Sequence, residues 1–419
     1  MKVVLINPPS PYLKDARAQP PMGLLYLAAS LEVQGEPIHR SHNVSVVDLA
    51  GDDEWQRTCS KLRGDVFGVS CTTPNFSIVK EIFKLLPGKA LKIVGGPHPT
   101  FMSLECLVEF DCDIVVMGEG EKILPQILAD YEDTGSHVAV YDGGLVDLDK
   151  LPMPARHLVD LKSYNPEMEG KATTIFTSRG CPYNCAFCAK LTGNVVRYRA
   201  VDKVMAELQT LVNEYGYRNV VFEDDNFCLD HDRVKAICKE IIDRKLDINI
   251  RICPRADSVN PSLLKLLRKA NVTEISFGVE SGSQKMLNFM QKGTTVDVIK
   301  RAIRAAKDVG MLVKIYLIVG FPGETEQTLE ETKQFVKDTQ PDKWLLQNFV
   351  PYPGTDVWNN PKKYGVTWIS HDYSQFYTVG KGGVGGLVFK TKTLTQEKIR
   401  MLHDDLFAFL ADYKPMGRS

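Results

Sequence analysis

The 419-residue chain lacks a long apolar run, an excess of one charge and a high density of cysteine. Its most apolar internal stretch, 311–321, contains Lys314 and is far shorter than the ~18 residues of a membrane span. The 51 basic and 52 acidic residues give a formal net charge of −1, so nothing favours a nucleic acid or an anionic membrane as partner. Ten cysteines are too dilute for a secreted disulfide scaffold, and Pro8 ends the only apolar run near the start, which argues against a signal peptide. We therefore expect a cytoplasmic α/β protein with reduced thiols, no membrane span and no nucleic-acid partner.

What the sequence does contain is a regular alternation of short apolar runs and amphipathic stretches. Over residues 1–147, five β-branched runs predict buried parallel strands at 3–6, 44–49, 66–71, 91–94 and 114–117. Helical patterns lie between these runs. This order predicts a doubly wound parallel sheet of five strands, whose ligand lies at the carboxyl ends of the strands.

A second series of strands and helices follows a proline-bearing stretch, 148–170, which we interpret as a linker. Over residues 171–350, six strands are predicted at 173–177, 219–222, 248–252, 274–278, 313–319 and 344–349. Six units are too few for a closed eight-stranded barrel, so we expect a partial, open (βα)6 barrel. Residues 351–419, with several aromatics and a final helical pattern, predict a short carboxyl-terminal cap over the substrate.

Three cysteines follow the first strand of the second series at CxxxCxxC spacing: Cys181, Cys185 and Cys188. A loop of this length can place three thiolates around one face of a [4Fe-4S] cluster and leave the fourth iron open. An open iron indicates a catalytic rather than a structural site. A zinc site and a thioredoxin-like CxxC are the alternatives. Zinc would want a fourth Cys or His, and none lies between Cys188 and Cys228.

This motif on a partial barrel resembles the radical S-adenosylmethionine (SAM) enzymes, over about residues 173–350. Three carboxylates after the second strand suit a cationic amine or sulfonium, although one of them would also serve as a helix N-cap. For Arg255, a bidentate contact with the SAM carboxylate and a surface salt bridge are both open. The resemblance implies a SAM site made by Phe187, Glu223, Asp224, Asp225, Arg255, Glu280, Ser281 and Gly320.

The first domain resembles that of the cobalamin-dependent (class B-like) radical SAM subclass, which has a flavodoxin-like cobalamin-binding domain before the barrel. The DxHxxG motif that elsewhere supplies a histidine to cobalt is absent, so no histidine ligand is expected below the corrin. A domain that only docks a substrate is the alternative. The resemblance implies a cobalamin site made by Pro8, Pro9, Gly23, Asp48, Thr72, Thr73, Pro74, Asn75, Gly95, Gly96, His98, Gly118, Glu119 and Gly120.

Together the resemblances imply a [4Fe-4S] cluster, SAM and cobalamin as cofactors and a flavodoxin or ferredoxin-type electron donor. The expected activity is methyl transfer from methylcobalamin to an unactivated carbon, after a 5′-deoxyadenosyl radical has removed a hydrogen atom. The alternatives are a cobalamin-using cyclase or oxidative enzyme, a methylthiotransferase, and a metal-binding sensor or electron carrier. The substrate is a small molecule, a lipid or a peptide. Cys71, Cys228 and Cys253 are interpreted as buried small apolar residues, with a place at the active site as the alternative.

Overall fold

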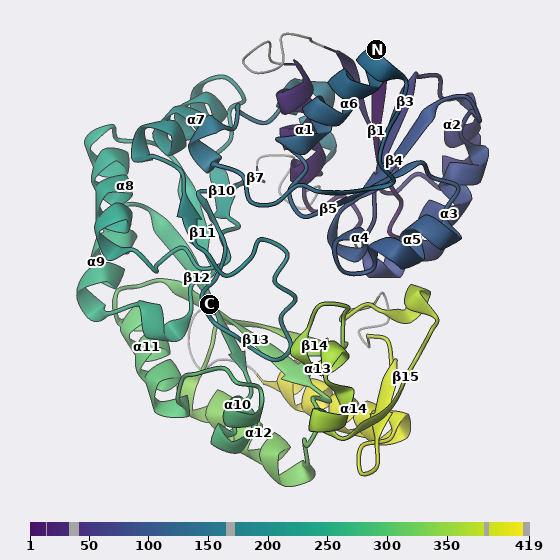
Figure 1. Ribbon diagram of the computed structural model, residues 1–419. Coiled ribbons are helices and arrows are strands. Elements are labelled where there is room, and N and C mark those ends of the chain that lie inside the picture. The colour runs from purple at the N-terminus through teal and green to yellow at the C-terminus, as the bar shows by residue number, and fades with distance from the viewer. Residues whose placement is uncertain (14, 33–41, 165–171, 381–384, 414–419) are drawn as a thin grey trace. The chain divides into compact units, whose positions relative to one another are not determined.

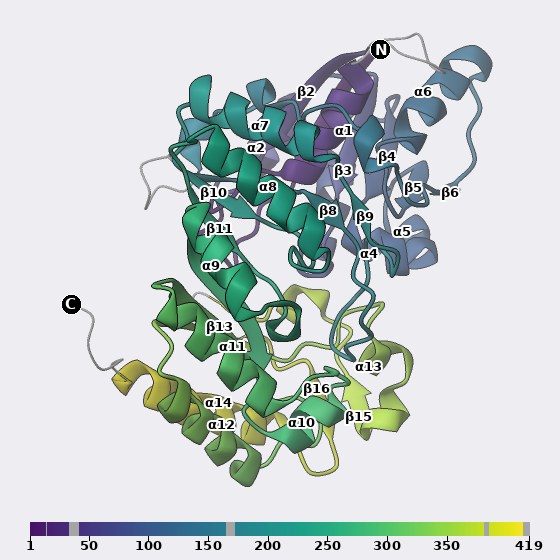
Figure 2. The ribbon, with the colours of Figure 1, turned by 90° about the vertical axis from the view of Figure 1, so that its left-hand side faces the viewer.

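The computed structural model describes residues 1–13, 15–32, 42–164, 172–380 and 385–413. The chain forms two compact units, shown in Figures 1 and 2. The first unit comprises Met1–Gly170 and Leu191–Gly193, and the second comprises Lys171–Lys190 and Asn194–Ser419.

The first unit is built on a six-stranded parallel sheet in the order β2-β1-β3-β4-β5-β6. The doubly wound sheet that the sequence predicts is confirmed, with one additional edge strand. That strand, β6, has only three residues and is at most half-buried, so it carries little apolar signal. The strands are β1 (Lys2–Asn7), β2 (Asn43–Asp48), β3 (Val66–Ser70), β4 (Leu91–Gly95), β5 (Ile114–Met117) and β6 (Val140–Asp142).

Helices cover both faces of this sheet. The inward sides of α1 and α6 share one apolar core with the strands, and Figure 1 shows α2 and α3 on the opposite face. Burial on both faces explains why the strands are continuous apolar runs. The helices are α1 (Met22–Glu32), α2 (Trp55–Lys61), α3 (Phe76–Leu85), α4 (Pro97–Phe101), α5 (Ser103–Glu109) and α6 (Ile123–Thr134).

The stretch interpreted as a linker, 148–170, packs on the first unit where it is described. Ala155 belongs to the core of this unit, and its backbone N–H donates to the Leu25 carbonyl at 3.0 Å. The Tyr164 hydroxyl donates to the Asp48 carboxylate at the end of β2. Three short 3-10 helices, Leu148–Lys150, Arg156–Leu158 and Leu161–Ser163, satisfy its backbone locally. The rest of this stretch, 165–170, lies outside the described residues.

The second unit contains the six parallel barrel strands that the sequence predicts, in the order β14-β13-β12-β11-β10-β7. On β13 the side chains of Val313, Ile315, Leu317 and Val319 are fully buried, whereas those between them are only partly buried and face the barrel interior. The strands are β7 (Ala172–Ile175), β10 (Asn219–Phe222), β11 (Asn249–Ile252), β12 (Val272–Glu280), β13 (Leu312–Val319) and β14 (Lys343–Asn348).

The helices between these strands cover the outer face of the barrel, as Figure 2 shows for α7, α8, α9 and α11. Four of them begin at side-chain N-caps, which are Asp230, Asn260, Thr295 and Thr325. The helices are α7 (Val201–Asn213), α8 (His231–Asp243), α9 (Pro261–Lys269), α10 (Gln284–Phe289), α11 (Val296–Asp308) and α12 (Glu326–Thr339).

The carboxyl-terminal region belongs to the second unit, because α14 packs against β13, β14 and α12. Residues 381–384 and 414–419 of the predicted cap lie outside the described residues. In the described part of the chain, no helix is long and apolar enough to cross a membrane. The remaining elements are α13 (Asp356–Asn359), α14 (Gln396–Asp412) and two antiparallel pairs, β8 (Ser178–Arg179) with β9 (Arg197–Tyr198) and β15 (Val366–Ile369) with β16 (Phe389–Thr391).

Candidate active site

The cysteine loop of the second unit is fastened at its start by two adjacent carboxylates after β10. Asp224 is buried and accepts hydrogen bonds from the Thr177 N–H at 2.6 Å and from the Ser178 hydroxyl at 2.6 Å. Asp225 accepts from the Gly180 N–H at 2.7 Å. Burial raises the pKa of Asp224, and the hydrogen bonds from Ser178 and Thr177 oppose that rise. The entrance to the loop is therefore ordered by protein groups alone.

The other end of the loop is held by backbone hydrogen bonds from two distant segments. The Ala186 N–H donates to the Met290 carbonyl at 2.8 Å, and the Val357 N–H donates to the Ala186 carbonyl at 3.3 Å. Ala186 is fully buried between Cys185 and Phe187. These contacts fix the backbone between the second and third cysteines.

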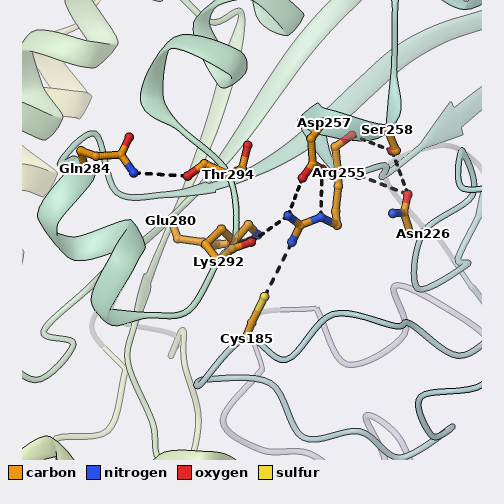
Figure 3. Close-up of polar contacts among 9 residues, drawn as sticks. All are labelled: Cys185, Asn226, Arg255, Asp257, Ser258, Glu280, Gln284, Lys292 and Thr294. Carbon is orange, nitrogen blue, oxygen red and sulfur yellow. Dashed lines mark hydrogen bonds and ion pairs between the residues drawn. The ribbon is translucent and has the colours of Figure 1, made fainter.

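Arg255 is only 8% exposed. Figure 3 shows it beside Cys185 of the cysteine loop. Its guanidinium donates twice to Asp257, at 2.9 and 2.7 Å, and once to the Lys292 carbonyl at 2.7 Å. The remaining Nη1 points at Cys185 Sγ at 3.7 Å, and the guanidinium stacks 3.6 Å from the centre of the Tyr183 ring. Asp257 thus uses the bidentate edge that the sequence interpretation gives to the SAM carboxylate. Arg255 is buried but Asp257 is exposed, so this pair is a salt bridge at the surface edge of the site and keeps part of the alternative interpretation.

A buried ion pair joins Lys292 to Glu280 at the end of β12, with Nζ and Oε1 2.7 Å apart. Burial alone would lower the pKa of Lys292, but Glu280 and Cys185 outweigh burial and hold the pKa above its usual value. The ammonium also lies 5.5 Å from the centre of the Phe187 ring. Glu280 adopts a left-handed backbone conformation, φ 64°, which is strained for a residue with a side chain.

These groups open into a cavity of about 340 Å³ at the carboxyl ends of the barrel strands. Of the predicted SAM residues, Phe187, Asp225, Arg255 and Glu280 line this cavity. Its remaining lining residues are Cys253, Pro254, Gly278, Lys292, Tyr316, Ile318, Gln347, Asn348, Phe349, Val350, Tyr352 and Thr378.

The other four predicted SAM residues are not among the lining residues. Asp224 points to the start of the cysteine loop. The Ser281 hydroxyl bonds to the Thr332 hydroxyl of α12 at 3.2 Å. Gly320, at φ 82°, lies against α14, where an added Cβ would come 2.7 Å from a methyl of Ile399. Glu223 is half-buried and influences the pKa of Cys253 and Tyr316 without lining the cavity.

The donor set fits a cubane cluster rather than a single metal ion. Cys181 lies near enough to Cys185 and Cys188 to raise the pKa of both thiols, with Cys181 and Cys185 partly buried and Cys188 exposed. Burial raises the pKa of Cys185, and the cations Lys292 and Arg255 oppose that rise, as suits a thiolate ligand. Within the described ranges, no three Cys, His, Asp or Glu side chains converge as one ion would require. A cubane needs no such convergence, because each thiolate binds its own iron.

In the first unit, most of the predicted cobalamin residues follow the carboxyl ends of neighbouring strands. Pro8 and Pro9 follow β1, and the 3-10 helix Thr73–Asn75 follows β3. Asn75 ties these two loops together, because its Nδ2 donates to the Pro9 carbonyl at 3.2 Å. The sheet topology brings to the same edge Pro8, Pro9, Asp48, Thr72, Thr73, Pro74, Asn75, Gly95, Gly96, His98, Gly118, Glu119 and Gly120. Gly23 lies instead in the first turn of α1.

Several side chains of this set make hydrogen bonds within the protein that hold the edge together. His98 is fully buried with its Nδ1 3.2 Å from the Thr73 hydroxyl, and burial lowers its pKa to about 4. Glu119 accepts from the Val146 N–H at 2.7 Å, and Asp48 accepts from Asn7 at 2.8 Å. These three residues shape the loops through their own hydrogen bonds.

The same edge fits a planar corrin with no histidine below cobalt. The Thr72 hydroxyl is buried and has no hydrogen-bond partner in the described part of the chain. At Gly96, φ 107°, an added Cβ would come 3.0 Å from the Cys71 carbonyl, so the chain turns there without a side chain. Cys71 is fully buried, and burial raises the pKa of its thiol, so it is a poor metal ligand.

The structure adds three residues to the second-unit site that sequence patterns miss. Lys292 follows α10 and returns to Glu280, Tyr183 supports Arg255, and Asn348 ends β14 inside the cavity. Cys253 lines the cavity, as the alternative interpretation has it, whereas Cys228 is fully buried. Of Lys292, Tyr183 and Asn348, only Asn348 could have been expected from the sequence, because it lies at the carboxyl end of a predicted strand.

Two protein families match the chain in the order that the fold shows. Residues 16–128 match the B12 binding domain, and residues 175–336 match the Radical SAM superfamily. An uncharacterized methyltransferase of Pyrococcus horikoshii is 28% identical over 96% of this chain and 90% of its own length. The anaerobic magnesium-protoporphyrin IX monomethyl ester cyclase of Cereibacter sphaeroides is 28% identical over 95% of this chain and 68% of its own.

Solved structures share the fold of nearly the whole chain. The radical S-adenosylmethionine methyltransferase TsrM of Kitasatospora setae matches with a TM-score of 0.74 and 20% identity, over 99% of this chain and 90% of that one. The cobalamin-dependent S-adenosylmethionine radical enzyme OxsB matches with a TM-score of 0.67 and 18% identity, over 97% of this chain and 60% of that one. At these identities the likeness shows a common fold.

Proposed function

Because the chain belongs to the cobalamin-dependent radical SAM enzymes, we propose that it transfers a methyl group from methylcobalamin to an unactivated carbon of its substrate. The observation that carries this proposal is the second-unit cavity, where four of the side chains predicted to bind SAM lie beside the cysteine loop. The methyltransferase names of relatives that match over most of their length support it.

The cofactors of this family are a [4Fe-4S] cluster, SAM and cobalamin, which together supply a carbon-centred radical and a methyl donor. In our proposal, Cys181, Cys185 and Cys188 hold the cluster and leave one iron free for SAM. Asp225 receives the methionine amino group, and Glu280 accepts the ribose hydroxyls.

The buried cations have a positioning role in this proposal. Arg255, braced by Asp257 and Tyr183, keeps a positive charge 3.7 Å from Cys185 Sγ. Lys292 neutralises Glu280 until the ribose arrives. A buried charge without a partner is costly, so these pairs keep the empty site folded.

In the first unit, we assign the cobalamin contact to backbone and small side chains at the sheet edge. Thr72 offers a buried hydroxyl to the ligand. Gly95, Gly96, Gly118 and Gly120 belong to the loops that we assign to the corrin and its nucleotide tail, and the positive φ of Gly96 and Gly118 sets the course of these loops. His98 supports Thr73, since its Nδ1 lies 3.2 Å from the Thr73 hydroxyl.

Radical SAM enzymes need an electron donor, and we propose a flavodoxin or a ferredoxin for this one. Such donors work in a reducing compartment. The ten free cysteines accord with the cytoplasmic location that the sequence predicts. The proposed substrate is a small molecule, a lipid or a peptide side chain. It binds at the carboxyl ends of the barrel strands.

A cobalamin-using cyclase is the second candidate, because relatives named anaerobic magnesium-protoporphyrin IX monomethyl ester cyclase match 85–95% of this chain. Product mass separates the two. A methyltransferase adds one CH₂ unit per turnover, and a cyclase does not.

The test is anaerobic reconstitution of the full chain with iron, sulfide, cobalamin, a reductant and SAM carrying a trideuterated methyl group, mixed with a metabolite extract. Methyl transfer predicts 5′-deoxyadenosine together with a product that carries the deuterated methyl. A Cys181→Ala, Cys185→Ala, Cys188→Ala variant is the control and should give neither. 5′-Deoxyadenosine with an unlabelled, altered product would favour the cyclase instead. Neither product from a fully loaded enzyme would exclude both candidates.

A further inference from the structure

One wall of the second-unit cavity contains none of the side chains assigned to the cluster or to SAM. It is formed by β13, β14 and the segment after them, and we call it the β14 wall. Every side chain in it is uncharged, in contrast to the ionic groups around Cys185. The β14 wall comprises Tyr316, Ile318, Gln347, Asn348, Tyr352 and Thr378.

Asn348 is the most informative residue of the β14 wall. It is only 1% exposed, and its Oδ1 has no hydrogen-bond partner among the described residues. Its Nδ2 donates to the Gly385 carbonyl at 3.3 Å. That contact fixes the orientation of the amide, because a flipped amide would set two oxygens against each other. Asn348 lines the cavity, and its buried Oδ1 is an acceptor that still requires a donor.

The backbone around Asn348 is packed so tightly that the amide has little freedom. The Asn348 N–H donates to the Thr378 carbonyl at 2.9 Å, and the Gly386 N–H donates to the Tyr377 carbonyl at 2.8 Å. An added Cβ at Gly385 would lie 2.4 Å from the Thr378 carbonyl, so only glycine fits there. Gln347 is fixed as well, since its Nε2 donates to the Thr378 hydroxyl at 3.1 Å. The acceptor is therefore preorganised before any ligand binds.

We propose that the β14 wall is the subsite for the methyl-accepting substrate and that it takes an uncharged group carrying an N–H or O–H donor, which bonds to Asn348 Oδ1. This inference rests on the proposed function for its substrate role. A buried acceptor without a partner lowers stability, and a donor on the substrate restores the missing hydrogen bond. The aromatic and aliphatic side chains of Tyr316 and Ile318 favour a flat, partly apolar group next to that donor. A charged group would lose its hydration here and meet no opposite charge in the wall.

The test measures binding of matched probe pairs to the reconstituted full chain with SAM and without reductant, so that no turnover occurs. Indole and 1-methylindole form one pair, phenol and anisole the second, and benzoate is the charged probe. We expect indole and phenol to bind at least about tenfold more tightly than their methylated partners, since a site built around a hydrogen bond rejects an analogue that lacks it. Benzoate should bind more weakly than phenol.

Asn348→Leu should abolish the preference within each pair, and Asn249→Leu, at the exposed amino end of β11, should leave it unchanged. If Asn348→Leu fails to take up a cluster, Asn348→Ala replaces it, because the smaller side chain also removes the acceptor and should abolish the preference. Equal binding within the pairs by the wild type, no binding of either donor probe, or a preference that survives in folded Asn348→Leu would overturn the proposal. Binding without turnover separates this result from failure of methyl transfer, which the deuterium-labelled assay reports by itself.

Discussion

At the scale of single residues, neighbouring side chains of one type have different tasks. Glu223, Asp224 and Asp225 form one acidic run in the sequence, yet Asp225 lines the cavity and Asp224 is buried under the cysteine loop. Glu223 continues the alternation of β10 and is half-buried. A run beyond a strand's end has no fixed periodicity, so the sequence alone could not assign these directions.

Substitution of Asp224 should reduce stability, whereas substitution of Asp225 should reduce SAM affinity. Asp224→Asn should lower the free energy of unfolding by about 2–3 kcal/mol, because a buried hydrogen-bonded carboxylate is replaced by an amide that cannot accept at both oxygens. Its cluster content after reconstitution should fall with it. Urea unfolding and iron analysis measure both quantities.

Asp225→Asn should keep its cluster, because the amide oxygen can still accept from the Gly180 N–H, but it should bind SAM about tenfold more weakly, which corresponds to ~1.4 kcal/mol. Equilibrium dialysis with SAM measures this affinity. The assignment of the two roles is incorrect if Asp224→Asn retains full stability, or if SAM affinity is unchanged in Asp225→Asn.

At the scale of elements, the turn after β13 is shaped by packing against α14. Gly320→Ala should destabilise the protein by about 1 kcal/mol from its positive φ and by a further ~1–3 kcal/mol from the contact with Ile399. Gly310→Ala is the matched control, because its φ is 79° and nothing lies within 4 Å of the added Cβ. Denaturant unfolding of both variants separates strain from packing. Equal losses would mean that α14 yields to the new methyl group.

The same turn predicts that the free energy of unfolding depends on pH. Glu324 accepts from the Gly320 N–H, and burial raises the pKa of its carboxyl to about 8 from an ordinary 4.5. Between pH 4.5 and pH 8 the Glu324 carboxyl is ionised in the unfolded chain but still protonated in the folded chain. Stability from this group is therefore present at low pH and declines as pH rises towards 8, by up to ~1.4 kcal/mol per pH unit.

Glu324→Gln should remove that decline. The wild type should lose stability relative to Glu324→Gln between about pH 5 and pH 8, as followed by urea unfolding at several pH values. Glu331→Gln, at an exposed position of α12, should behave like the wild type. Parallel pH profiles for wild type and Glu324→Gln would contradict the raised pKa.

The strands of both sheets were predictable, because parallel strands buried on two faces must be short apolar runs. Elements without that signal were missed. The helix α4, Pro97–Phe101, contains two prolines, and β8 and β9 have two residues each. The cysteine loop was recognised from its spacing, whereas Lys292 and Tyr183 act through folding of distant segments, which spacing does not record.

At the scale of the whole molecule, each of the two units has its own parallel sheet and its own candidate cofactor site. We expect two thermal transitions in anaerobic calorimetry. Cobalamin should raise the transition temperature of the first unit and leave that of the second unit unchanged, because a ligand stabilises the part of the chain that binds it. Reconstitution with iron and sulfide should raise the transition temperature of the second unit in the wild type. It should have no such effect in the triple cysteine-to-alanine variant. A single transition that both cofactors shift together would contradict independent units.

The cysteine loop is held by Asp224, Asp225, Met290 and Val357 through hydrogen bonds that involve no iron. The order of assembly follows from this. The barrel can fold first and receive its cluster afterwards, in contrast to small metal-dependent domains that are unfolded without their metal. A cell short of iron would then accumulate folded, empty enzyme, and activity would return on resupply of iron and sulfide without new protein synthesis.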